Sequence, residues 1–303
     1  MLPKCYEVTW NMRKNLLSIQ KWIEDTEAWQ WSLDDYLLDR SMRELECNAE
    51  DVLENMHKLL EVMEQSIIYG LTGVKSHSGL TGGSAKILIN DHENCLLGEL
   101  GHKAVAYAMA VAECNAAMGC IAAAPTAGAS GVLPGVLFAL KEEKNLSYEQ
   151  LERGMVVAGS IGQVIAERAS LSGAMGGCQA ECGSAAAMAA GAAVCLLGGT
   201  PKQVGDAVSI VFKNVLGLVC DPVAGLVEVP CIKRNGACAL QALLAAEMAL
   251  SGIGSFIPAD EAIDAMKSVG DSLPCALRET AGGGLATTPS ALAWTKEYFS
   301  KND

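Results

Sequence analysis

The chain has 303 residues, with 22 basic against 35 acidic side chains and a formal charge of −13 at pH 7. This charge excludes a typical nucleic-acid-binding protein or a basic membrane-surface helix, because a row of phosphates or lipid head groups would not be neutralised. Half of the residues are hydrophobic but only 5% are aromatic. The apolar content is therefore mainly small and aliphatic, and the length suffices for a continuous core.

The first 70 residues differ in composition from the rest of the chain. They carry 7 basic and 14 acidic side chains, and they hold four of the five tryptophans: Trp10, Trp22, Trp29 and Trp31. We expect an acidic, Trp-rich helical segment over residues 1–70, packed on a helical catalytic domain over residues 71–303. The tryptophans either fasten this segment to the core or form a docking surface, and the sequence favours neither.

Helix start signals recur along the chain. Asn48, Ser147 and Thr200 are each followed three residues later by a side chain suited to a capping box. The helices expected from these and similar signals run from Asn48 to about Gly70, from Ser147 to about Ala169, from Thr200 to about Leu216, and from Pro258 to Val269. Sustained period-2 alternation is hard to find. The predicted fold is mainly α, a compact Ala/Gly-rich helical domain whose glycine-rich loops build the site.

Two long segments without charge, Cys182–Pro201 and Asn115–Leu140, require a membrane check. The first consists mainly of Ala, Gly and Ser, and the second is broken by Pro125 and Pro134. Irregular backbone is not tolerated in contact with lipid. We therefore expect buried helices and no membrane span.

Twelve cysteines are too few for a disulfide scaffold, and no apolar leader precedes them. We expect reduced thiols in the cytoplasm. Cys178, Cys220 and Cys231 lie at turn-rich helix boundaries, where backbone N–H groups can stabilise a thiolate. Spacing alone leaves open whether these three bind a metal or pack. Cys182 is either a fourth ligand or a buried small residue, and the other eight are interpreted as packing.

Glycine-rich segments form a second group of candidates. Ser78–Gly83 and Ala124–Gly131 combine hydroxyls with glycines, and Ala281–Pro289 is a weaker case. Such segments either turn N–H groups toward an anion or are ordinary turns. These segments match neither the Walker loop, which ends in Gly-Lys-Ser/Thr, nor the G-x-G-x-x-G motif of dinucleotide-binding proteins. A carboxylate is therefore a better candidate ligand than a nucleotide. No lysine has a recognisable pyridoxal phosphate setting, and we expect no pyridoxal phosphate.

These segments together resemble the alpha chain of the iron–sulfur-dependent L-serine dehydratases, also called L-serine ammonia-lyases. The matching pieces are Ser76-His-Ser-Gly-Leu-Thr-Gly-Gly83, Asn115-Ala-Ala-Met-Gly119, Ala124-Pro-Thr-Ala-Gly-Ala-Ser-Gly131, Ser172-Gly-Ala-Met-Gly-Gly-Cys-Gln-Ala-Glu181, Cys220-Asp-Pro-Val-Ala-Gly-Leu-Val-Glu-Val-Pro-Cys231 and Leu277-Arg-Glu-Thr280. Together with the glycine-rich run Ala281–Pro289 that follows the last piece, they span residues 76 to 289 in the order of the family.

The resemblance implies a cofactor and a reaction. The family's three cluster-binding cysteines fall on Cys178, Cys220 and Cys231, which would hold a [4Fe–4S] cluster with one open iron. Such an iron acts as a Lewis acid toward the hydroxyl of L-serine, which would be converted to pyruvate and ammonia. The alternatives are a cysteine desulfidase on the same scaffold and a non-catalytic iron–sulfur subunit.

The resemblance and the loops also predict residue roles and partners. His77 is the candidate general base, with Lys75 behind it. The residues expected to bind the substrate are Ser78, Gly79, Thr81, Gly82, Gly83, Asn115, Thr126, Gly128, Ser130 and Ser172. Family enzymes of this size work with a separate beta chain, a homo-oligomer is compatible with this arrangement, and the reaction belongs to amino-acid degradation and gluconeogenesis.

Overall fold

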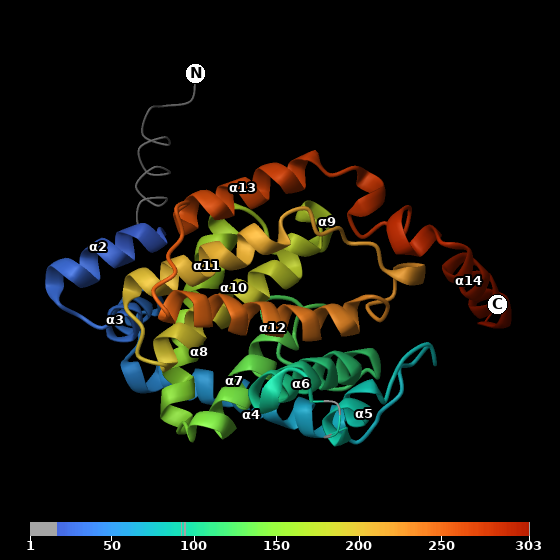
Figure 1. Cartoon of the computed structure of the whole chain (residues 1–303), viewed down its shortest axis with the longest axis horizontal. Coiled ribbons are helices and arrows are strands. Elements are labelled where there is room, and N and C mark those ends of the chain that lie inside the picture. Colours follow the sequence, from blue (N-terminus) through green and yellow to red (C-terminus); the bar gives the residue numbers. More distant parts are fainter. Residues whose placement is uncertain (1–16, 92, 94, 303) are drawn as a thin grey trace.

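The computed structural model describes residues 17–91, 93 and 95–302, and the described chain is built of helices (Figure 1). The first are α2 (Ile19–Trp29), α3 (Leu33–Leu45), α4 (Ala49–Leu71), α5 (Ser84–Asn90), α6 (Gly98–Ala116), α7 (Val132–Lys144) and α8 (Tyr148–Arg168). They are followed by α9 (Gly173–Gly176), α10 (Cys178–Leu196), α11 (Pro201–Val215), α12 (Cys231–Leu250), α13 (Ala259–Ser272) and α14 (Pro289–Asn302). Within the described residues, extended pairing is limited to two isolated β-bridges. The mainly α prediction is confirmed.

The predicted helix starts are confirmed by their caps. The side chains of Asn48, Ser147 and Thr200 each accept the backbone N–H three residues later, and all three form reciprocal capping boxes. The ends of α4, α8 and α11 lie within a residue of the predicted ones. These boundaries follow from the sequence because a cap depends on residues within one turn.

Helix α10 lies at the centre of the molecule, between α8, α11 and α12 (Figure 1). Its Ala/Gly composition lets neighbouring helices approach closely. A Cβ added to Gly191 would lie 2.2 Å from the Cδ1 atom of Ile161 in α8, and one added to Gly183 would lie 2.9 Å from Val215. None of the described helices is long and apolar enough to cross a membrane. The prediction of a core helix is confirmed for Cys182–Pro201, most of which lies in α10, but it is wrong for the middle of Asn115–Leu140, where residues 117–131 form a loop between α6 and α7.

The N-terminal helices share this core. Trp22 and Ile19 of α2 are fully buried and belong to the same apolar cluster as the residues of α10. Arg153 of α8 lies 2.8 Å from both Asp34 and Asp35 of α3, which links the two helices. By contrast, Trp29 and Trp31 are 57% and 43% exposed. Trp10 lies outside the described residues.

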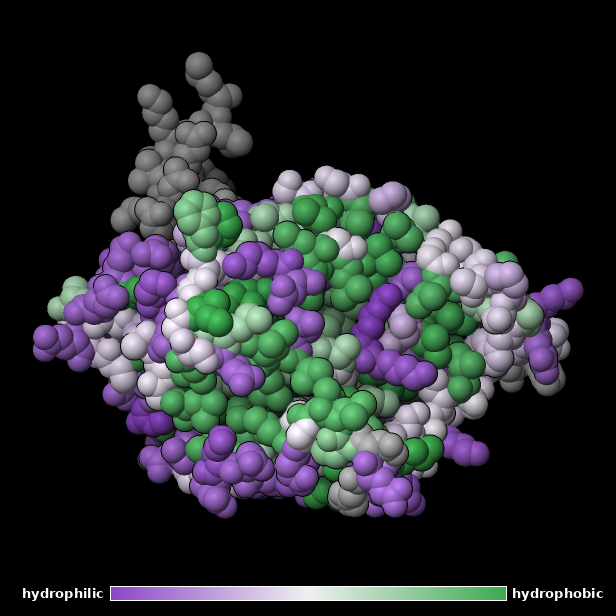
Figure 2. Space-filling model, in the orientation of Figure 1, coloured by the Kyte–Doolittle hydropathy of each residue, from purple (hydrophilic) through white to green (hydrophobic). Residues whose placement is uncertain are grey.

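One face of the molecule is unusually apolar. Figure 2 shows a broad hydrophobic zone across the middle of this face, over the positions of α12 and α6 in Figure 1, with hydrophilic side chains along its lower border. Large apolar side chains exposed on the molecule include Leu96, Leu244 and Phe256. Contiguous apolar surface of this kind is typical of an interaction site.

Candidate active site

Two helix N-termini and one loop supply the three cysteines singled out above. Cys178 is the first residue of α10 and Cys231 is the first residue of α12. Cys220 is held between these helices and the C-terminal region, because its N–H donates to Leu277 O over 2.9 Å and its carbonyl accepts the N–H of Glu279 over 2.8 Å. The N-terminus of a helix favours an anionic group. The fold therefore brings the three thiols together at two helix N-termini and the loop that precedes α12.

All three side chains are buried and interact electrostatically with one another. Burial raises the pKa of Cys231 to about 12, and the charge of Cys178 adds to this effect. Burial likewise raises the pKa of Cys220, and the charges of Cys178 and Cys231 raise it further. Such mutual repulsion is expected where thiolates lie close together without a bound cation. A coordinating metal would instead lower the pKa of each thiol.

Cys178 differs from the other two. A hydrogen bond from the Cys182 thiol lowers the pKa of Cys178, and the positive charge of Arg234 lowers it further. The pKa of Cys182 itself is raised well above its usual value by its hydrogen bonds to Cys178 and Cys238 and by burial. Cys182 therefore stays protonated and donates to Cys178, which favours a supporting role over that of a fourth ligand.

The remaining cysteines divide between interior and surface. No disulfide joins the eleven cysteines of the described residues. Cys114 and Cys238 are buried, but Cys120 and Cys275 are exposed. The interpretation of the eight other cysteines as packing residues is therefore wrong for Cys120, which lies in a loop, and for Cys275, which begins the short 3-10 helix Cys275–Leu277. Cys5, also among the eight, lies outside the described residues.

The donor set fits a cluster better than a single ion. Within the described residues, no three His, Cys, Asp or Glu side chains converge closely enough to hold one metal ion. The cysteine ligands of a cubane bind separate irons, so they are spaced more widely than the ligands of one ion. Three buried free thiols within electrostatic reach of one another meet the requirement for a cluster held by three thiolates.

Two carboxylates border the cysteines. Glu181 Oε1 accepts a hydrogen bond from Thr126 Oγ1 over 2.6 Å. Burial raises the pKa of Glu181, and the nearby charge of Glu279 adds to this. A Cβ added to Gly173 would lie 2.9 Å from Cys220 Sγ and 3.2 Å from a carboxylate oxygen of both Glu181 and Glu279. These groups converge on the space that only a glycine leaves open.

The predicted loop over residues 124–131 closes one side of this space. A Cβ added to Gly128 would lie 2.5 Å from Glu181 Oε1, so glycine is needed there too. Asn235 of α12 donates its amide to Gly128 O over 2.8 Å and to Cys231 O over 2.9 Å. Ser130 is fully buried and donates to Ala127 O within the loop. The hydroxyl of Ser130 therefore supports the loop.

The predicted loop over residues 76–83 lies beside the start of α12. Thr81 Oγ1 donates to Glu228 Oε2 over 2.8 Å, which ties this loop to the segment before Cys231. Gly79, Gly82 and Gly83 adopt positive φ angles, and a Cβ on Gly82 would lie 2.4 Å from Val74 O. A cavity of about 330 Å³ separates the loop from α12, and its lining includes Lys75, Gly79, Thr81, Gly82 and Lys233.

The other predicted residues are less closely tied to the cysteines. His77 is exposed, and its backbone N–H donates to Ala116 O over 3.0 Å at the end of α6, next to Asn115. Among the described residues, no side-chain hydrogen bond or ion pair joins His77 or Lys75 to a cysteine. The Ser78 hydroxyl accepts the N–H of Leu80, and the Ser172 hydroxyl caps α9 through the N–H of Ala174.

Four residues that organise the site were not predicted from the sequence. Glu181, Arg234, Asn235 and Glu279 contact the cysteines or their loops, although none was assigned a role. Glu181 and Glu279 lie within the quoted segments, and Arg234 follows Cys231 by three residues, which places both on one face of a helix. That spacing is the signal that could have indicated Arg234.

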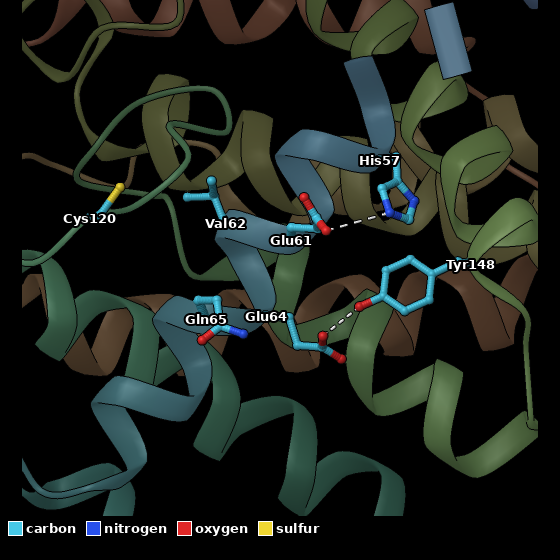
Figure 3. A pocket seen from close by; sticks show the side chains of 7 residues that line it. All are labelled: His57, Glu61, Val62, Glu64, Gln65, Cys120 and Tyr148. Carbon is cyan, nitrogen blue, oxygen red and sulfur yellow. Dashed lines mark hydrogen bonds and ion pairs between the residues drawn. The ribbon is translucent and has the colours of Figure 1, made fainter. Parts of the chain in front are cut away.

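A larger cavity of about 640 Å³ lies elsewhere, between α4 and the start of α8 (Figure 3). Its polar groups pair with one another: Tyr148 donates to Glu64 over 2.5 Å, and His57 contacts Glu61 on the same helix. None of the predicted site residues lines this cavity. We therefore place the candidate active site at the three cysteines.

Fold and site together define an all-helical protein with a buried three-thiol centre bounded by glycine-rich loops. The family described as "Serine dehydratase alpha chain" matches residues 13–286. The chain belongs to this family, which confirms the resemblance.

Named relatives agree with this assignment. The chain is 50% identical over 285 residues to the "Probable L-serine dehydratase, alpha chain" of Bacillus subtilis, covering 93% of this chain and 95% of that one. It is 40% identical to the L-serine dehydratase alpha chain of Peptoniphilus asaccharolyticus, covering 89% and 93%. The L-serine dehydratase of Streptomyces coelicolor is 48% identical over 182 residues, which are 59% of this chain and 40% of that longer protein.

Proposed function

We propose that the chain is the catalytic alpha chain of an L-serine dehydratase, a lyase that converts L-serine to pyruvate and ammonia. The observation that carries this proposal is the grouping of Cys178, Cys220 and Cys231 at two helix N-termini and the loop between them. Membership of the family and the names of the relatives support the same reaction.

In this proposal, Cys178, Cys220 and Cys231 would hold a [4Fe–4S] cluster through their sulfur atoms. A cluster bound by three protein thiolates supplies a Lewis acid for the departing hydroxyl group. The protein contributes burial, which excludes water from the thiols, and the N-terminal ends of α10 and α12, whose dipoles would offset the negative charge of the Cys178 and Cys231 thiolates. Free thiols of this kind suit a reducing compartment, so we place the protein in the cytoplasm.

The loops would recognise the amino acid. Backbone N–H groups and hydroxyls of residues 76–83 and 124–131 would hold the substrate carboxylate, with Thr126 kept in place by Glu181. His77 would take the Cα proton on an imidazole nitrogen, with Lys75 as the second candidate. Loss of the proton and the hydroxyl leaves an aminoacrylate, which tautomerises and is hydrolysed to pyruvate and ammonia.

We further propose that a separate beta chain completes the enzyme. Two relatives carry the designation alpha chain, and the Streptomyces coelicolor protein has most of its length outside the match. The apolar zone over α12 and α6 in Figure 2 supports a partner of this kind.

A serine assay on anaerobically purified protein, reconstituted with iron and sulfide, tests the proposed reaction. Pyruvate and ammonia should form from L-serine in equal amounts. The assay is run both with and without the beta chain. Incubation with L-cysteine distinguishes the dehydratase from a cysteine desulfidase. A desulfidase would release sulfide from L-cysteine with a higher kcat/KM than it would release pyruvate from L-serine. Iron-loaded protein that releases neither product in the presence of the beta chain would overturn the proposal and leave a non-catalytic subunit.

A further inference from the structure

One guanidinium group contacts the surroundings of all three cysteines. Arg234 Nη1 donates to Val219 O over 2.8 Å, and Nη2 lies 2.9 Å from Asp221 Oδ1. These two residues flank Cys220. The positive charge of the same guanidinium also acts on Cys178, on another helix, and lowers the pKa of that thiol. Arg234 itself lies one turn after Cys231 in α12.

The partners of this guanidinium are anchored in turn. Asp221 is almost fully buried, and its Oδ2 accepts the N–H of Leu285 over 2.7 Å. Only 18% of the Arg234 side chain is exposed, against 4% for Asp221. A planar guanidinium presents its donors in a fixed fork, so contacts in several directions also fix the relative positions of its partners. A flexible lysine ammonium cannot reproduce this arrangement.

The positive charge of the Arg234 guanidinium has a second role. Arg234 interacts electrostatically with Cys178, Cys231 and Asp221, while Glu181 and Glu279 add negative charge at Cys220. Nearby charge contributes to the stability and the reduction potential of iron–sulfur centres. A fixed positive charge beside the cysteines therefore offsets the charge that three thiolates bring.

We propose that Arg234 is the positioning residue of the three-cysteine centre: its guanidinium holds the Cys220 loop in register with Cys231 and offsets the negative charge of the thiolates. This inference rests on the proposed function for the bound cluster. The positioning itself belongs to the protein alone and can be tested without iron.

The test compares R234Q and R234K with R153Q. Arg153 is a suitable control because its guanidinium also links two elements, here α8 to the carboxylates of Asp34 and Asp35 in α3. In the metal-free protein, hydrogen exchange of residues 217–222 should be at least tenfold faster in R234Q than in wild type. It should be intermediate in R234K and unchanged in R153Q. Unchanged exchange of this segment in R234Q would overturn the positioning role.

Iron retention is the second readout. After anaerobic reconstitution, R234Q should lose iron to a chelator at least tenfold faster than wild type, whereas R153Q should match wild type. If R234Q fails to fold, R234K carries the comparison, with a smaller increase expected in both rates. Iron loss within twofold of wild type in both Arg234 variants would contradict the inference. Failure of wild type to bind iron would instead overturn the cluster assignment, and the exchange result would still decide the positioning role.

Discussion

The side-chain Oδ1 of Asn235 accepts a hydrogen bond from the backbone N–H of Gly131 over 3.0 Å, and both residues are buried. The amide group of the same side chain donates to Gly128 O and Cys231 O. One asparagine thus joins the glycine-rich loop to the helix that begins at Cys231. The position of the loop relative to the cysteines depends on this contact.

Replacing Asn235 with leucine should therefore destabilise the protein. The change leaves one N–H and two carbonyls buried without their partner, and each unsatisfied group costs about 1–3 kcal/mol. We expect the free energy of unfolding to fall by at least about 2 kcal/mol, measured by urea denaturation. N214L is the matched control, since Asn214 is exposed and its amide bonds only Gln241. Equal stability of the two variants would contradict this role.

Gly173 should tolerate no side chain in the assembled site. A Cβ there would lie 2.9 Å from Cys220 Sγ, so G173A should displace the thiol and reduce the iron bound after reconstitution to less than half of wild type. G159A is the control, because nothing lies within 4 Å of an added Cβ at this position in α8. The control should keep full iron content and be slightly stabilised, since alanine favours a helix. Normal iron content in G173A would argue against the placement of Cys220.

His77 is tested by separating catalysis from cluster binding. If His77 is the general base, H77Q should lower kcat at least about a hundredfold while iron content stays at the wild-type value. H57Q is the matched control, because His57 lies in the other cavity and pairs with Glu152. A loss of less than tenfold in H77Q would transfer the role to Lys75 or to the beta chain.

Glu181 should make the stability of the metal-free protein depend on pH. Burial, with a contribution from Glu279, raises the pKa of this carboxyl above its ordinary value of 4.5. The folded state then favours the protonated acid, so stability falls as pH rises from about the unfolded pKa of 4.5 through the higher folded pKa. Thermal unfolding of E181Q between pH 4.5 and 8 should show a smaller fall than wild type. E149Q, at an exposed position, should follow wild type.

Local features of the fold were predictable from the sequence, because they depend on residues close together in the chain. The caps at Asn48, Ser147 and Thr200 are examples, as is the core position of the Ala-rich helix α10. The exposure of Cys120 and Cys275 was not predictable, since it depends on which distant segments cover these two positions.

The site was predictable only in part. Helix-boundary positions and the family resemblance indicated Cys178, Cys220 and Cys231, but their mutual approach requires the packing of α10 against α12. The contacts of Asn235 with Gly128 and of Thr126 with Glu181 join residues 107 and 55 positions apart. No local pattern encodes such pairs. The roles of His77 and Lys75 remain predictions.

The cluster assignment, on which the account depends, is tested most directly by counting iron and sulfide per chain after anaerobic reconstitution of single cysteine variants. A cluster held by these three cysteines predicts about four irons in wild type, a loss of most of this iron in C178S, C220S and C231S, and at least half of it retained in C182S. C195S, at a position outside the site, should match wild type. Full iron content in C220S, or none in wild type, would contradict the three-cysteine cluster.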